Sequence, residues 1–164
     1  MLVYHGSILE IKQPEIIRTE YGRDFGFAFY TTDIKEQAER WAVRKAKIQN
    51  RIKNQNAIPI VNVYEWNIES SDLYIKEFSG ASMEWLDMIL SCRSNIHYQH
   101  NYDIVIGKIA DDNVGETVSY VMQGIMRKED AVERLKFEKI NNQIAFCSEV
   151  AIKTLSFAES YIVR

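Results

Sequence analysis

Strand-like and helix-like segments follow one another along this chain without a regular alternation. Strand patterns are expected over residues 2–6, 27–31, 60–68, 73–78, 102–109, 144–147 and 161–163. Helix patterns are expected over residues 33–50, 83–96, 114–126, 128–137 and 149–155. Because a parallel sheet needs a crossover helix between neighbouring strands, this irregular order favours an α+β fold built mostly on antiparallel strands.

Size and composition limit the class of protein. The 164 residues, 46% of them hydrophobic, suit a single domain over residues 1–164, and no repeat or linker interrupts them. With 20 basic and 23 acidic residues the net charge is -3, which disfavours a generally basic nucleic-acid binder but leaves room for a local basic face. No apolar run reaches the roughly 18 residues of a membrane span, and the N-terminus has no signal-peptide pattern. We therefore expect a cytoplasmic protein without a membrane partner.

The helix expected over residues 33–50 begins with an N-terminal signature. Asp33 has the residue type of an N-cap, and Glu36 three positions later completes a capping-box pattern. Between Arg40 and Lys53 lie six basic residues and no acidic one. Two interpretations of this stretch stay open: a solvated helix face, or a face that binds an anion or an acidic partner.

Sequence motifs of common enzymes and metal sites are absent. The chain has no GxxxxGK[ST], GxGxxG, HExxH or GxSxG motif. His97 and His100 lie near Asp103, but a metal site would need further ligands, so we interpret the pair as part of a polar loop. Cys92 and Cys147 are too few for a zinc site or a disulfide framework and are expected to be buried thiols. We therefore predict no metal site.

Three segments, taken in order, carry a stronger signal than any one of them alone. They are residues 4–7 (YHGS), residues 26–33 (GFAFYTTD) followed by a helix bearing Trp41, and residues 142–146 (NQIAF). In this order the chain resembles the ADP-ribosyltransferase superfamily, in its branch of diphtheria toxin and poly(ADP-ribose) polymerases. More narrowly, it looks like a family of small, stand-alone bacterial domains related to that branch. The resemblance spans almost the whole chain.

The resemblance implies a fold and a set of site residues. The fold would be ADP-ribosyltransferase-like, a mostly antiparallel split β-sheet core with flanking helices. His5 would hydrogen-bond the adenosine ribose of NAD, and the Gly6 backbone would hold the nicotinamide carboxamide. Tyr30 would pack on the nicotinamide ring, with Trp41 as the second stacking aromatic. Gln143 would occupy the position of the usual catalytic Glu, so His5, Tyr30 and Gln143 would form the catalytic set.

Two further residues have alternative interpretations. Arg23 lies in the loop of residues 22–26, where the superfamily has its donor loop. It would meet the NAD pyrophosphate through a forked contact, or instead form a salt bridge with Asp24. Glu149 would be a substitute acid, or simply the first residue of a helix.

The glutamine in place of Glu limits the chemistry that the resemblance implies. Cleaving the nicotinamide glycosidic bond develops positive charge on the ribose, and the neutral amide of Gln143 cannot act as a general base. We therefore expect transfer of a single ADP-ribose unit from NAD, the co-substrate, to a macromolecular acceptor. One alternative is a catalytically inactive module that binds NAD or ADP-ribose. Another is an interaction protein that retains the fold.

The resemblance also bears on partners. Small bacterial domains of this kind are frequently toxins or effectors, so a neutralising partner protein is expected. The acceptor stays open between proteins, nucleic-acid ends and small molecules. The basic stretch from Arg40 to Lys53 favours an acidic acceptor or partner.

Overall fold

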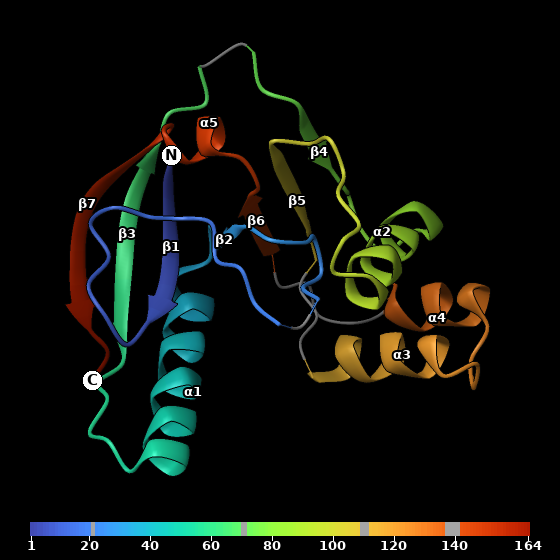
Figure 1. Ribbon diagram of the computed structural model, residues 1–164, viewed down its shortest axis with the longest axis horizontal. Coiled ribbons are helices and arrows are strands. Elements are labelled where there is room, and N and C mark those ends of the chain that lie inside the picture. Colours follow the sequence, from blue (N-terminus) through green and yellow to red (C-terminus); the bar gives the residue numbers. More distant parts are fainter. Residues whose placement is uncertain (21, 70–71, 109–111, 137–141) are drawn as a thin grey trace.

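The computed structural model describes residues 1–20, 22–69, 72–108, 112–136 and 142–164 (Figure 1). Its strands are β1 (Leu2–Ser7), β2 (Phe29–Thr31), β3 (Ile60–Trp66), β4 (Ile75–Glu77), β5 (Ile104–Lys108), β6 (Asn142–Phe146) and β7 (Leu155–Ile162). Its helices are α1 (Lys35–Lys53), α2 (Met83–Ser94), α3 (Asp112–Met122), α4 (Lys128–Leu135) and α5 (Glu149–Ile152). Every strand and helix expected from the sequence has a counterpart in the described residues, although several ends differ, and the expected ends at residues 109 and 137 lie outside them.

The strands form two sheets that meet along β1 and β2. One sheet has the order β1-β3-β7 and the other the order β2-β6-β5-β4. Among the described strands, β4 and β5 pair in parallel and every other pair is antiparallel. A bridge between Tyr4 and Thr32 ties β1 to the end of β2 and holds the two sheets together. The fold is therefore α+β with mostly antiparallel strands, as the sequence predicts.

Helices cover the two sheets in separate groups (Figure 1). α1 packs along β1 and β3 through Ala38, Ala42 and Ala46, small buried side chains that recur every four residues on one helix face. α2, α3 and α4 pack together beside the second sheet, where Trp85 and Leu135 are fully buried. No helix within the described ranges is both long and apolar enough to span a bilayer.

The start of α1 differs from the sequence prediction. The N-cap is Ile34, which makes no side-chain cap, so the prediction of Asp33 as N-cap with a capping box is wrong. Thr32 closes the turn instead, because its Oγ1 accepts a hydrogen bond of 3.0 Å from the backbone N–H of Ile34. The Asp33 carboxylate accepts a hydrogen bond of 3.0 Å from the side-chain amide of Asn142. The Asp33 side chain therefore bonds β6 rather than the first turn of α1.

The last strand is longer than its pattern predicts. β7 spans Leu155–Ile162, whereas the sequence pattern marks only residues 161–163. β7 is an edge strand that pairs with β3 alone among the described strands, and most of its side chains are at least partly exposed. A half-exposed edge strand needs little apolar alternation, so its sequence carries a weak strand signal.

Candidate functional site

A cavity of about 240 Å³ lies where β2 and β6 meet α1 and α2. Its lining residues are Gly22, Arg23, Asp24, Tyr30, Trp41, Arg93 and Gln143. The structure therefore brings together four of the residues singled out from the sequence, namely Arg23, Tyr30, Trp41 and Gln143. They come from a loop, two strands and a helix that are far apart in the chain.

Strand register explains why Tyr30 and Gln143 share this cavity. Tyr30 on β2 pairs with Ala145 on β6. Gln143 lies two residues before Ala145 on the same strand, so the two side chains point to the same face of the sheet. A diagonal cross-strand pair of this kind is within reach of long and aromatic side chains.

Gln143 has an unusual environment. Its side chain is only 6% exposed, and its Nε2 has no hydrogen-bond partner. A buried amide group without a partner costs about 1–3 kcal/mol, so proteins seldom retain one without a reason. Gln143 is among the residues that line the cavity, so an amide that turns toward a bound ligand would give its Nε2 the acceptor that it lacks.

The Tyr30 side chain is fixed by its hydroxyl group. The hydroxyl donates a short hydrogen bond to the carbonyl of Gly26 and accepts one of 3.2 Å from the backbone N–H of Phe25. Burial, with the Asp24 carboxylate as a further cause, raises the pKa of Tyr30 well above its usual value. The phenol therefore stays protonated, and the ring presents a fixed apolar surface.

The loop of residues 22–26 is held in place at both ends. A Cβ on Gly22 would lie 2.5 Å from the carbonyl oxygen of Cys92, so the loop backbone packs directly against the end of α2. Gly26 has a φ of 81°, in the left-handed region that favours glycine. Arg93 of α2 also binds the loop, since its Nε lies 2.6 Å from Oδ1 of Asp24.

Arg23 does not form an ion pair with the neighbouring carboxylate of Asp24. Asp24 pairs with Arg93, whose Nη2 lies 2.5 Å from Oδ1. The Arg23 guanidinium instead lies over the ring of Tyr30, 4.8 Å from its centroid. The alternative of an Arg23–Asp24 salt bridge is therefore not observed, and a cation covers the ring that was expected to stack on nicotinamide.

His5 is not among the residues that line the cavity, although its ring is hydrogen-bonded to the backbone of Tyr30, which does line it. Its side chain is 4% exposed and stacks on Phe29 with ring centroids 4.4 Å apart. Burial, followed by the charge of Lys45, lowers the pKa of His5 to about 3, so the imidazole is neutral near pH 7. Its Nδ1 lies 2.6 Å from the carbonyl oxygen of Tyr30. A carbonyl can only accept, so Nδ1 carries the proton and Nε2 is the acceptor nitrogen.

Gly6 follows His5 and lies against α1. A Cβ at this position would lie 2.7 Å from the backbone nitrogen of Ala42 and closer still to the carbonyl oxygen of Ala38. Glycine is therefore required for the close approach of β1 and α1. The Gly6 carbonyl accepts a hydrogen bond of 2.6 Å from Nζ of Lys45.

Glu149 lies where a helix-start residue was expected. It is the first residue of α5, directly after the N-cap Ser148. It is not among the residues that line the cavity. Its position favours the structural interpretation over that of a substitute acid.

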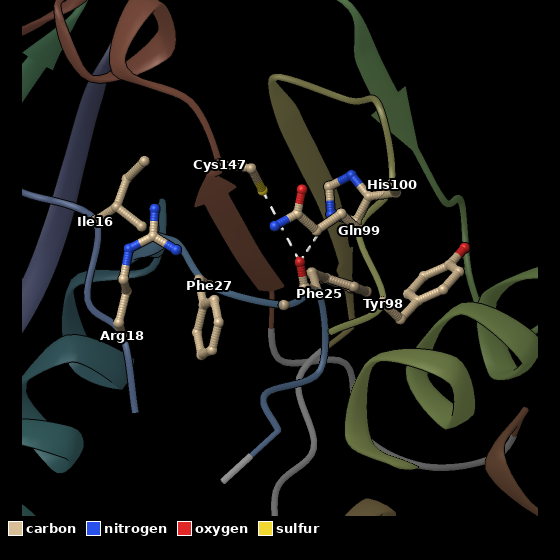
Figure 2. Close-up of a pocket in the computed structure, with 9 residues that line it drawn as sticks. Ile16, Arg18, Phe25, Phe27, Tyr98, Gln99, His100 and Cys147 are labelled. Carbon is tan, nitrogen blue, oxygen red and sulfur yellow. Dashed lines mark hydrogen bonds between the residues drawn. The ribbon is translucent and has the colours of Figure 1, made fainter. Parts of the chain in front are cut away.

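A second cavity, of about 160 Å³, is lined mainly by residues 25–27 and 98–100, together with Cys147 (Figure 2). It places Cys147 and His100 near each other, and Nε2 of His100 lies 2.8 Å from the carbonyl oxygen of Phe25. Burial raises the pKa of Cys147 to about 12. This thiol is therefore not an activated nucleophile. Within the described ranges, no group of three or more His, Cys, Asp or Glu side chains could hold a metal ion.

Sequence reasoning missed two residues near the first cavity. Arg93 reaches the loop from a position 69 residues away in the chain, and no local pattern reports such a contact. Lys45 belongs to the basic stretch of α1, and its spacing of one helical turn from Trp41 was a usable signal.

A family model described as "Protein of unknown function (DUF3990)" matches residues 1–157. Neither a curated protein nor a solved structure matches the chain.

Proposed function

The chain belongs to the DUF3990 family, whose description assigns no activity, and we propose that it binds NAD and transfers one ADP-ribose unit to a macromolecular acceptor. The observation that carries the proposal is the buried, unpartnered amide nitrogen of Gln143, a residue that lines a cavity together with Tyr30 and Trp41. Aromatic side chains and one precise polar group are what a ring-bearing ligand needs for a fixed orientation. The proposal includes an ADP-ribosyltransferase-like fold for the two joined sheets.

The cavity suits one end of the dinucleotide. Its volume of about 240 Å³ is below the usual range for pockets that enclose a drug-sized ligand. It would take the nicotinamide ring and part of the attached ribose, while the rest of NAD extends outside. Tyr30 and Trp41 would contact the ring, and the Gln143 amide would bond the ribose.

His5 supports the same placement through its tautomer. Because Nδ1 is committed to the Tyr30 carbonyl, Nε2 is an acceptor at neutral pH. An acceptor nitrogen suits a ribose hydroxyl, which is the role that the resemblance implies. The same hydrogen bond couples the position of His5 to that of Tyr30.

The proposed reaction needs little acid–base chemistry from the protein. The bond between ribose C1′ and the nicotinamide nitrogen breaks, and its electron pair neutralises the pyridinium charge. The oxocarbenium-like ribose is then attacked at C1′ by a lone pair of the acceptor, whose proton passes to solvent. Gln143 orients the ribose through a hydrogen bond, without the negative charge that would stabilise the cation most strongly.

The neutral side chain at position 143 also favours a second candidate function. Asp24 provides the one carboxylate among the residues named above as lining the cavity, and it is paired with Arg93. In the second candidate function, the domain therefore binds NAD or ADP-ribose without cleaving it. Under either function, a neutralising partner and a role as toxin or effector remain proposals drawn from the resemblance.

The test measures nicotinamide release from NAD by the wild-type protein, two variants of Gln143 and one control variant. Gln143→Ala should lower kcat about 10²–10³-fold with little change in KM, because one transition-state contact is lost. Gln143→Glu should accelerate NAD hydrolysis, since it restores a negative charge beside the ribose. Gln123→Ala, an exposed amide, is the matched control and should be silent.

The outcomes separate the candidates. Turnover in the wild type that Gln143→Ala does not change would remove Gln143 from the site. NAD binding without nicotinamide release would favour the non-catalytic module. Absence of both would refute the proposed function. Circular dichroism of each variant confirms that it is folded.

A further inference from the structure

Two cationic side chains lie beside the cavity described above. Trp41 lines the cavity, and Lys45 lies one helical turn further along the same face of α1. The residue Lys45 is exposed as a whole, but its ammonium end is held on the Gly6 carbonyl at 2.6 Å. Arg23 approaches from the loop and lies over Tyr30 at 4.8 Å from the ring centroid.

The two positive charges act on each other. Desolvation, and after it the charge of Arg23, lower the pKa of Lys45 to about 8. Both cations also contribute to the lowered pKa of the neighbouring His5. Two cations held in mutual repulsion at a cavity are an arrangement that an anion would stabilise.

No carboxylate in the described part of the chain forms an ion pair with either cation. The acid closest to them in the loop, Asp24, pairs with Arg93 of α2. Lys45 uses a neutral carbonyl as acceptor, and Arg23 uses an aromatic ring. Both contacts are replaceable, since a phosphate oxygen is a stronger partner than either group.

We propose that Lys45 and Arg23 together form a diphosphate-binding site at the mouth of the cavity. Lys45 is the new element, since nothing in the motifs assigns it a role. The inference deepens the proposed function and rests on it for the choice of ligand, the diphosphate that links the two halves of NAD. On binding, Arg23 leaves the ring of Tyr30, which frees that surface for nicotinamide.

The geometry agrees with the direction in which the ligand must leave the cavity. The cavity holds only one end of a dinucleotide. His5 and Gly6 of β1 lie beside Lys45 of α1. A chain running from the cavity past Trp41 reaches Lys45 after one helical turn. Lysine binds phosphate as a point charge, and arginine adds a planar fork.

The experiment is calorimetric titration of the wild type and three variants with ADP-ribose, inorganic pyrophosphate and nicotinamide. Lys45→Met should weaken ADP-ribose and pyrophosphate binding about 10–100-fold, the usual scale for losing a charged hydrogen bond. Nicotinamide affinity should change less than about twofold, because the ring pocket is intact. Lys45→Arg should restore most of the affinity for both phosphorylated ligands.

Lys47→Met is the matched control. Lys47 lies two positions along α1 on the exposed side and lines a separate groove. Its replacement removes the same charge from the same helix without touching the cavity. Phosphate affinity in this variant should stay within about twofold of the wild type at matched salt, since net charge acts only at long range.

A pH series supplies a readout that a structural role would not move. ADP-ribose affinity should fall as the pH rises through and above 8, because Lys45 loses its proton. The groups that face it are the Arg23 guanidinium, whose charge is fixed, and His5 of β1, whose pKa of about 3 keeps it neutral throughout. The fall should be absent in Lys45→Arg.

The outcomes for this inference and for the proposed function differ. Equal ADP-ribose affinity in Lys45→Met and the wild type would overturn the diphosphate site, even if nicotinamide release shows the transferase to be active. Loss of pyrophosphate and ADP-ribose binding in Lys45→Met, in a protein that neither binds nicotinamide nor cleaves NAD, would support the diphosphate site and reject the transferase. A weakening of equal size in Lys47→Met would also overturn the site, since only net charge would then matter.

Discussion

At the scale of single residues, the hydroxyl of Tyr30 connects the site to the loop that covers it. It contacts the backbone of both Phe25 and Gly26, while the ring faces the cavity. We predict that Tyr30→Phe lowers the free energy of unfolding by about 1–3 kcal/mol, because a buried N–H and a carbonyl lose their partner. Urea denaturation measures the change. Nicotinamide affinity should fall far less than in Tyr30→Ala, where the ring itself is lost.

His5 gives the molecule a pH dependence of stability. In the unfolded chain its pKa is about 6.5, and in the folded protein about 3, so the unfolded state binds more protons between these values. Stability is therefore complete above pH 6.5 and falls as the pH drops toward 3. We predict a loss of about 2 kcal/mol between pH 6.5 and 5 from this group alone.

Urea denaturation of the wild type, His5→Gln and His97→Gln at pH 6.5 and pH 5 tests this prediction. His97 is exposed, so its replacement should leave the pH dependence as it is. A wild-type pH dependence that survives in His5→Gln would contradict the assignment to His5.

At the scale of elements, the Asp24–Arg93 pair ties the loop of residues 22–26 to α2. Asp24 is 7% exposed, so removing Arg93 leaves a nearly buried charge without this ion pair. We predict that Arg93→Met lowers the free energy of unfolding by about 2 kcal/mol. Arg127→Met removes an exposed pair with Asp130 and should cost less than about 1 kcal/mol. Equal losses in the two variants would show that the loop does not depend on this bond.

The contact between β1 and α1 is a second test at this scale. Gly6→Ala places a Cβ against the helix backbone and should cost about 1–3 kcal/mol through overpacking. Gly115→Ala is the matched control, because nothing lies within 4 Å of its Cβ position in α3. There the same substitution should stabilise the helix by up to about 1 kcal/mol. Chemical denaturation of both variants compares them, and a harmless Gly6→Ala would show that the helix can shift.

Some elements and site residues could be predicted from the sequence, and others could not. Helices with a clear apolar face, such as α1, were found because periodicity reports burial directly. Tyr30 and Gln143 were singled out because they lie in ordered strand motifs. Asp33 was assigned the wrong role, because its carboxylate bonds Asn142, 109 residues away. Arg93 could not be assigned to the site from a local pattern, since its partner is set by tertiary packing, whereas the helical spacing of Lys45 from Trp41 was a local signal that could have been used.

At the scale of the whole molecule, ligand binding should appear as thermal stabilisation. The cavity joins a loop, both helix groups and the second sheet, so a ligand that fills it binds the folded state alone. NAD at 100 times its dissociation constant should stabilise the fold by about 2.7 kcal/mol. For a chain of this length that corresponds to a rise in Tm of about 5–10 °C. Scanning calorimetry measures it, and an unchanged Tm with saturating NAD would contradict a dinucleotide site.

The anchoring of the loop of residues 22–26 at both ends limits which changes of sequence it can accept. Gly22 is pressed against the end of α2, and Gly26 turns the backbone into the strand that carries Tyr30. Between them Arg23 and Asp24 point to different partners, one to the Tyr30 ring and the other to Arg93. An inserted or deleted residue would move both side chains off those partners at once. We therefore expect the fold to tolerate a change in the number of residues between the two glycines less well than a conservative substitution at one of these residues.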